Sequence, residues 1–508
     1  MGDFNGDGYQ DMAVGAAAED LGSGNSIKDA GAVNVIYGSA AGLTATGNQL
    51  WTQDSAGILD QAEAGDLFGG ALTVGDFNGD GVSDLAVAAP LENIGAAADS
   101  GAVNIIYGQA GTGLTSTNNQ LWTEVQAFGS ATAGDVFGDS LTAGDFNGDG
   151  VSDLVIGVPG RDLGAANAGG VDVVYGTSGV GLTQAGQQFW SQGQGGILGV
   201  PQTDDAMGAL GTASADLNGD GTDDLAVGNP FDDEAGPVDS GSVNVIFGQG
   251  GTGLVSTNNQ IWTQNSPNII GIASTNAFFG FDVAAADLGN GPQADLAIGA
   301  PGKGIGTHTT AGVVNVIYGS ASGPTSTGNQ YWTQNTAGIL GDAGTNDGFG
   351  NALAAADFNG DGTADLGIAV AGDLVGTKTS AGSVNVIYGT VGGLNASGNQ
   401  LWTQNSPGIV GLSETGDDFG FDLAAGDLGN GSQADLVVGV ALEDLGTGNS
   451  IKDAGAVNAI YGSSGGLHST GNQQWTQDSP SIVGIAEAGD EFGFAFGFAS
   501  GSPGNRPA

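Results

Sequence analysis

The fold is decided by a nine-residue acidic stretch, Asp76-Phe-Asn78-Gly-Asp80-Gly81-Val82-Ser-Asp84. Stretches with aspartate at the first and ninth positions begin at Asp3, Asp76, Asp145, Asp216, Asp287, Asp357 and Asp427. The period is roughly 70 residues, which is typical of repeat architectures. The chain therefore consists of seven copies of one structural unit.

Each copy presents the same segments in the same order. An apolar stretch that opens with Phe-Gly precedes the acidic stretch, and a short run ending in Gly-Ala-Pro or a relative follows it. A variable loop leads to a Val-Asn-Val-Ile-Tyr-Gly run, and the last segment carries the single tryptophan of the copy. These runs are short, rich in Val, Ile, Tyr and Phe, and bounded by Gly, Asn, Asp and Pro, as strands are. We predict an all-β, seven-bladed β-propeller of four-stranded antiparallel blades, with a linear solenoid as the rival.

The two chain ends favour a closed ring. The first copy lacks its Phe-Gly strand, whereas a spare one lies at Phe492–Ala499, after the seventh copy is complete. Pairing of that strand with Asp11–Gly15 would remove the exposed edges of a linear stack. We therefore predict one domain over residues 1–500 and a flexible tail over residues 501–508, although length alone would suggest several domains.

The Phe-Gly opening, the D-x-N-x-D-G-x-x-D stretch and the Gly-Ala-Pro ending resemble the FG-GAP repeats of the integrin α-subunit propeller. The resemblance covers nearly the whole chain. It implies an extracellular or cell-surface protein with a binding or adhesion role, and we expect a non-catalytic protein. In integrins the face opposite the acidic loops binds ligand, so the resemblance places a protein or glycan ligand there. The same repeat occurs in enzyme-associated domains, so a polysaccharide-acting enzyme or its carbohydrate-binding domain is one alternative. A self-associating surface layer or filament is another.

The acidic stretches are candidate Ca²⁺ sites, because Ca²⁺ takes six to eight oxygen ligands from carboxylates, amides and backbone carbonyls. In the second copy, Asp76, Asn78 and Asp80 offer side-chain oxygens, Val82 its backbone carbonyl, and Asp84 closes the site. The same set recurs at Asp3, Asn5, Asp7, Tyr9 and Asp11; at Asp145, Asn147, Asp149, Val151 and Asp153; at Asp216, Asn218, Asp220, Thr222 and Asp224; and at Asp357, Asn359, Asp361, Thr363 and Asp365.

Hairpin turns rich in Asn, Asp and Gly also form without metal, but three adjacent carboxylates would then repel one another. We therefore predict about five structural Ca²⁺ ions. The stretches at Asp287 and Asp427 have glycine at the third and fifth positions, which removes two ligands, and are predicted to be metal-free turns.

The few basic side chains gather in one part of the repeat. The variable loop after the Gly-Ala-Pro run carries every lysine and arginine except Arg506: Lys28, Arg161, Lys303, Lys378 and Lys452. In an up-and-down blade this loop lies on the face opposite the acidic stretches. These side chains are candidate ligand-binding residues, with neutralisation of nearby acids such as Asp29 as the equally weighted alternative.

Composition excludes several function classes. The formal net charge of −49, from 55 acidic and six basic residues, opposes binding of nucleic acid or anionic membranes. Cysteine is absent, no apolar run of about 18 residues could span a bilayer, and no signal peptide is present, so we expect a processed form or fragment of a secreted precursor. The sequence contains no phosphate-binding loop, and its two histidines, His308 and His468, lie in variable loops. The recurring tryptophans are interpreted as packing residues between blades.

Overall fold

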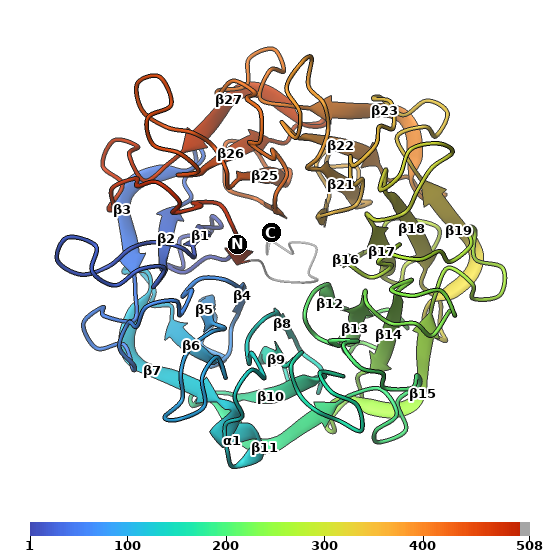
Figure 1. Ribbon diagram of the computed structural model, residues 1–508, viewed down its shortest axis with the longest axis horizontal. Helices are drawn as coiled ribbons and strands as arrows, with labels where there is room; N and C mark the ends of the chain where they lie inside the picture. The colour runs from blue at the N-terminus through green and yellow to red at the C-terminus, as the bar shows by residue number, and fades with distance from the viewer. Residues whose placement is uncertain (498–508) are drawn as a thin grey trace.

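In the computed structural model, which describes residues 1–497, seven four-stranded antiparallel sheets surround one axis (Figure 1). This confirms the predicted seven-bladed propeller. Blade 1 contains β28 (Phe496–Gly497), β1 (Met12–Ala16), β2 (Ala32–Tyr37) and β3 (Thr44–Trp51). Blade 2 contains β4 (Leu72–Gly75), β5 (Asp84–Ala89), β6 (Ala102–Tyr107) and β7 (Thr115–Thr123). Blade 3 contains β8 (Leu141–Gly144), β9 (Asp153–Gly157), β10 (Val171–Thr177) and β11 (Gly181–Trp190).

The other four blades repeat the pattern from the inner strand to the outer strand. Blade 4 contains β12 (Thr212–Ala215), β13 (Asp224–Asn229), β14 (Ser242–Phe247) and β15 (Val255–Trp262). Blade 5 contains β16 (Val283–Ala286), β17 (Asp295–Ala300), β18 (Val313–Tyr318) and β19 (Thr325–Trp332). Blade 6 contains β20 (Leu353–Ala356), β21 (Asp365–Val370), β22 (Ser383–Tyr388) and β23 (Asn395–Trp402). Blade 7 contains β24 (Leu423–Gly426), β25 (Asp435–Val440), β26 (Ala456–Tyr461) and β27 (His468–Trp475).

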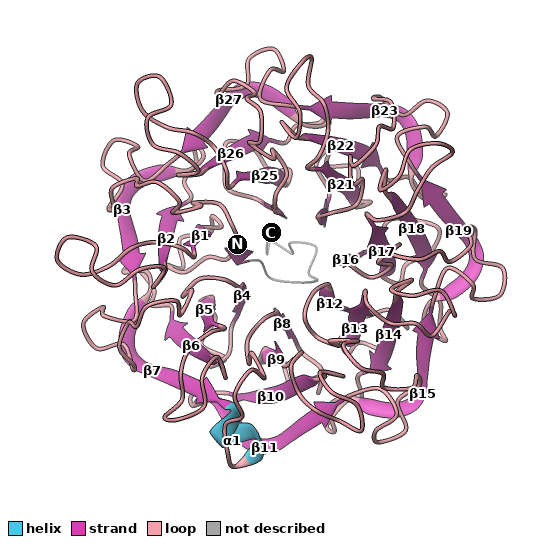
Figure 2. Ribbon diagram, viewed as in Figure 1, coloured by secondary structure: helices cyan, strands magenta, loops and turns pink. Residues whose placement is uncertain are grey.

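The burial of each strand follows from its place in the blade. The second and third strands of a blade are apolar runs buried at nearly every position, because neighbouring blades cover both of their faces. The fourth strand lies on the rim and is partly exposed and polar until its tryptophan (Figure 2). Solvent exposure within the strands of a blade is therefore concentrated in the outer strand.

The core consists of layers between adjacent blades. One such layer joins Trp332 and Tyr318 of blade 5 to Ile368 of blade 6, which confirms the packing role predicted for the tryptophans. The recurring tyrosines add a hydrogen bond across each of several junctions. For example, the Tyr388 hydroxyl of blade 6 accepts the backbone N–H of Leu467 in blade 7 at 3.1 Å.

Strand register places the loops on two faces. Gly75 of β4 pairs with Asp84 of β5, so the acidic stretch of blade 2 connects these strands at one end of the blade. At the other end of β5, Ala89 pairs with Ala102 of β6, and the variable loop connects them there. We call these ends the acidic-loop face and the opposite face; the opposite face also carries the connections from one blade to the next.

The ring closes through the predicted strand. In β28, Phe496 and Gly497 pair with Val14 and Ala13 of β1, and the backbone N–H of Phe496 donates to Asp422 Oδ2 of blade 7 at 3.0 Å. Within the predicted segment Phe492–Ala499 the strand itself begins at Phe496, although Gly493 and Ala495 already make backbone hydrogen bonds with Gly15 of β1. Residues 498 and 499, and the predicted tail 501–508, lie outside the described residues.

Two local features differ from the sequence-based expectation. The Phe-Gly pairs precede the inner strands instead of opening them: Phe68 is buried, and Gly69 adopts a φ of +96° where a Cβ would lie 2.8 Å from the carbonyl oxygen of Ala32. A short helix, α1 (Glu124–Phe128), follows β7 at the rim and was not expected (Figure 2). It forms because Thr123 and Gln126 make a capping box at its start.

Candidate functional site

Five of the acidic stretches form closely similar loops on one face of the ring. In blade 2, Asp76 accepts the backbone N–H groups of Asp80 at 3.0 Å and Gly81 at 2.8 Å. Asp80 in turn accepts the backbone N–H of Val82 at 2.9 Å. The corresponding bonds occur in the loops that begin at Asp3, Asp145, Asp216 and Asp357. The five intact loops therefore share one backbone conformation, in which the first, third and fifth residues lie on a short turn.

The last aspartate of each loop is buried and bonded to backbone on two sides. Asp84 Oδ2 accepts the N–H of Phe77 at 2.9 Å, and Asp84 Oδ1 accepts the N–H of Gly108, at the end of β6, at 2.9 Å. Burial raises the pKa of the Asp84 carboxyl to about 8, against the lowering effect of these donors. The cost of ionising Asp84 would fall if a cation lay beside it.

The donor set of the intact loops fits a hard cation. The Asn78 amide lies 3.3 to 3.4 Å from the Asp84 carboxylate, and in blade 1 Asn5 Oδ1 is buried without a hydrogen-bond partner. None of the ion pairs among residues 1–497 neutralises an intact loop. Carboxylate, amide and backbone oxygens are the ligands that Ca²⁺ prefers. The structure thus places the Asn78 amide beside Asp84, but within residues 1–497 the three carboxylates of an intact loop do not all lie within 4.8 Å of one another. The ligand set and the ion stay predictions.

The stretches at Asp287 and Asp427 take a different path. A Cβ on Gly289 would lie 1.9 Å from the carbonyl oxygen of Thr390, and a Cβ on Gly429 would lie 1.8 Å from that of Ser39. The backbone of the following blade therefore occupies the space where an asparagine side chain would lie. Asp295, the last aspartate of the first of these two loops, still accepts the backbone N–H of Leu288 at 2.8 Å. These two loops still connect the first and second strands of their blades, but they lack the side chains of the third and fifth positions.

The five basic side chains lie on the opposite face and fall into three classes. Lys28 and Lys452 are exposed and pair with Asp20 and Asp444 of their own loops. Such exposed pairs contribute little to stability. Lys378 is exposed.

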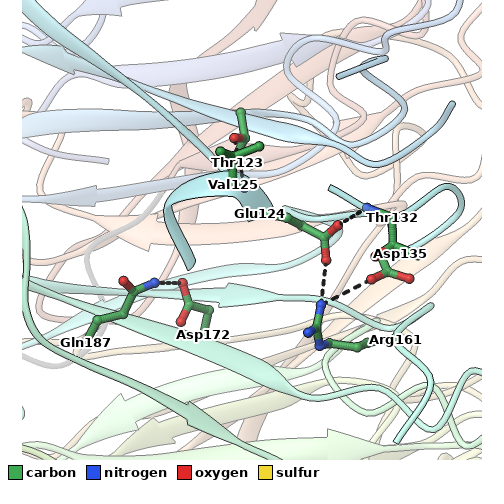
Figure 3. A network of polar contacts seen from close by, with 8 residues as sticks. All are labelled: Thr123, Glu124, Val125, Thr132, Asp135, Arg161, Asp172 and Gln187. Carbon is green, nitrogen blue, oxygen red and sulfur yellow. Dashed lines mark hydrogen bonds and ion pairs between the residues drawn. The ribbon is translucent and has the colours of Figure 1, made fainter. Parts of the chain in front are cut away.

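Arg161 and Lys303 are less exposed and reach across a blade junction. Arg161 Nη1 lies 3.1 Å from Glu124 Oε1 (Figure 3). Its guanidinium lies over the Phe128 ring, 3.6 Å from the ring centroid. Lys303 Nζ donates to the backbone oxygen of Ile272 and, at 3.0 Å, to Ser274 Oγ. The structure therefore does not gather the five side chains into one site, and four of them have partners within the chain.

Sequence reasoning missed a set of exposed apolar side chains on the same face. Val200, Ile272, Leu412 and Ile485 are 61 to 73 % exposed and occupy equivalent positions in the connections between blades. Their signal in the sequence is an aliphatic residue that follows an aliphatic-Gly pair at the same place in several copies. Each of these side chains belongs to a different connection between blades, so the set recurs around the opposite face.

The opposite face also contains a shallow cavity of about 440 Å³ between blades 3 and 4. Pro159, Asn167, Asp204 and Phe231 contribute to its walls. Asn167 Nδ2 donates to Asp204 Oδ1 at 2.7 Å, so the cavity combines an aromatic ring with a fixed polar pair. This combination suits a small polar ligand or a side chain of a partner.

The repeat model of one family matches four parts of the chain. The FG-GAP repeat model matches residues 1–36, 68–105, 137–174 and 209–246. The chain carries FG-GAP repeats. The matched parts contain the acidic loops of blades 1 to 4 and the strands on either side of them.

Curated relatives are similar over parts of the FG-GAP propeller. Phosphatidylinositol-glycan-specific phospholipase D of Bos taurus is 35 % identical over 173 residues, which are 34 % of this chain and 19 % of the relative. Integrin alpha-5 of Xenopus laevis is 30 % identical over 278 residues, which are 54 % of this chain and 23 % of the relative. The chain thus spans less than a quarter of the length of either relative.

A solved structure, an exotype rhamnogalacturonan lyase, aligns with 86 % of this chain and 69 % of its own at 14 % identity and a TM-score of 0.36. A likeness at that score supports no inference about this chain. No helix in the described residues 1–497 is long and apolar enough to cross a membrane.

Proposed function

We propose that the chain is a calcium-stabilised extracellular or cell-surface propeller that acts as a non-catalytic binding or adhesion module through its opposite face. The observation that carries the proposal is the recurring set of exposed apolar side chains on that face, beside the basic loops and the shallow cavity. The similarity to integrin α chains supports the same role. The partner is a protein or a glycan that contacts these blade connections.

Calcium has a structural task in this proposal. The residues that would hold it are those of the five intact loops, which lie on the acidic-loop face, away from the binding surface. The ions would neutralise the buried terminal aspartates and hold the strand connections in place. Binding of the partner would therefore depend on calcium only indirectly, because calcium would keep the propeller folded.

The experiment compares partner binding by the full chain and two variants on protein and glycan arrays in calcium buffer. The double variant I272D/L412D places charges among the exposed apolar side chains of the opposite face, and we expect binding to fall at least tenfold. The control V391D changes a side chain that is 92 % exposed in the β22–β23 connection, on the acidic-loop face, and should bind as the parent does. Equal losses in both variants, or turnover of a polysaccharide by the parent chain, would contradict the proposal.

A further inference from the structure

A second acidic cluster lies on the opposite face, at the junction of blades 1 and 2. One carboxylate oxygen each from Glu63, Asp66 and Glu92 lies within 4.8 Å of the others. Asp66 and Glu92 are 0 % and 3 % exposed, whereas Glu63 is exposed and leaves the cluster open to solvent. The first two residues precede β4 and the third lies between β5 and β6, so the cluster is separate from the acidic loops.

Neighbouring polar groups orient the cluster and leave two oxygens free. Gln53 Nε2 donates to Glu92 Oε2 at 2.7 Å, and Asn93 Nδ2 donates to Glu63 Oε2 at 3.2 Å. Asp66 Oδ1 and Gln53 Oε1 are buried without hydrogen-bond partners, and Gln53 is 1 % exposed. Asp66 Oδ2 accepts the backbone N–H of Glu63 at 2.5 Å, so only Asp66 Oδ1 and Gln53 Oε1 lack a positive or donating partner, and buried oxygens without one are costly.

Blade 3 supplies that missing group from the chain itself. Counted from the Phe-Gly pair, Asp135 corresponds to Asp66, and counted from the proline, Arg161 corresponds to Glu92. Arg161 Nη1 lies 3.1 Å from Glu124 Oε1 and 3.4 Å from Asp135 Oδ2, and both carboxylates are nearly fully buried (Figure 3). In blade 3 the guanidinium of Arg161 therefore supplies the positive charge beside the buried carboxylates.

Blade 5 fills the same position in another way. Lys303 corresponds to Glu92, and Ser274 and Ala277 replace the two carboxylates that correspond to Glu63 and Asp66. Lys303 Nζ bonds to Ser274 Oγ at 3.0 Å, so the ammonium group lies beside the position that corresponds to Glu63. Blade 5 thus has a lysine and none of the three acids. Blade 2 has all three acids and no basic side chain at these positions.

We propose that Glu63, Asp66 and Glu92 bind a hard divalent cation, with the Gln53 amide as a further oxygen ligand. Three carboxylates and an amide form an all-oxygen donor set, which Ca²⁺ and Mn²⁺ accept and softer metals do not. Two other junctions repeat these residue types, with Glu19, Glu487 and Asp490 at blade 1 and Glu414, Asp417 and Glu443 at blade 7. The proposal concerns stabilisation of a blade junction on the opposite face and does not depend on the binding function.

The test counts Mn²⁺ bound to the full chain by electron paramagnetic resonance during titration. The variant D66A/E92K gives blade 2 two of the three residues of blade 5, an alanine and a lysine, so the ring should remain folded and the variant should bind one ion fewer per chain than the parent. A second variant, E63Q/E92Q, keeps the volume of both side chains and should lose the same ion. The control E124Q removes a buried carboxylate from the arginine-filled cluster of blade 3 and should leave the count unchanged.

The alternative occupant is a proton shared between Asp66 and Glu92. In that case both variants would bind as many Mn²⁺ ions as the parent, and the proposal would be overturned. If D66A/E92K fails to fold, the count for E63Q/E92Q decides in the same way. A loss of one ion in both variants and in the control would also overturn it, because the effect would then be unspecific.

Discussion

At the scale of single residues, the last aspartate of each acidic stretch has two separable roles. Its two oxygens accept backbone N–H groups from its own loop and from the next strand in the metal-free loops as well as in the intact ones. The bonds of Asp435 show that this role needs no ligand set around it. The aspartates and asparagine earlier in the loop are the residues that distinguish a predicted metal site from a plain turn.

Removing two ligands from one intact loop should remove one ion. The variant N78G/D80G gives blade 2 the glycines of the metal-free loops, so we expect one Ca²⁺ fewer per chain and a smaller rise in melting temperature on calcium addition. One site at a hundredfold excess of ligand over its dissociation constant contributes about 2.7 kcal/mol. Calorimetric titration and thermal melts measure both effects. The control N290G lies in a metal-free loop and should bind as much calcium as the parent.

The buried Asp435 should make stability depend on pH. Burial raises the pKa of its carboxyl to about 8, while the N–H donors of Gly462 and Leu428 act in the opposite direction. The folded chain then holds this proton more tightly than the unfolded chain, so the contribution is full below about pH 4 and is lost as pH rises through 8. D435N cannot ionise, and its unfolding midpoint should fall less than the parent's between pH 5 and pH 8. An equal fall of the unfolding midpoint in D435N and in the parent over this pH range would contradict the prediction.

At the scale of elements, the strands were predictable and their exact starts were not. Runs such as the one that forms β5 are apolar, short and bounded by turn residues, and each forms a strand in the structure. The sequence pattern predicts that the Phe-Gly pair starts the inner strand, but Gly69 instead lets the chain pass close to Ala32 of the preceding blade. That contact lies between residues far apart in sequence. The capping box that starts α1 at Thr123 is a local signal, so the helix is predictable from sequence.

The strand β28 should hold the ring closed. Phe496 is buried in the layer between blades 7 and 1, and truncation of such a side chain costs about 3 to 5 kcal/mol. We expect F496A to lower the denaturant midpoint of the whole ring in a single transition, measured by tryptophan fluorescence. V391A, at a side chain that is 92 % exposed, should leave the midpoint unchanged. A separate early transition in F496A would show that closure is local to one blade.

At the scale of the whole molecule, charge opposes compaction, and bound calcium would offset part of that opposition. Five Ca²⁺ ions carry ten positive charges, which would bring the formal net charge from −49 to −39. The sequence predicted the loops because these are local and repeated. It could not predict the cluster of Glu63 and Glu92, because its members come from two loops that only the blade brings together.

Salt should reduce the same charge repulsion that bound calcium is proposed to reduce, and so should raise the melting temperature of the calcium-free chain. The screening length falls from about 30 Å at 0.01 M ionic strength to about 3 Å at 1 M. We therefore expect the melting temperature of the chelated chain to rise with NaCl more steeply than that of the calcium-loaded chain. Equal slopes in the two series, measured by differential scanning calorimetry, would show that the ions do not relieve charge repulsion.

The location of calcium is the most direct test of the central claim that this FG-GAP propeller is stabilised through its intact acidic loops. The measurement is an anomalous difference map from crystals of the full chain grown in calcium. We predict one peak within each of the loops that begin at Asp3, Asp76, Asp145, Asp216 and Asp357, and none in the loops that begin at Asp287 and Asp427. Intact loops without a peak, or peaks in the two glycine-containing loops, would contradict the account.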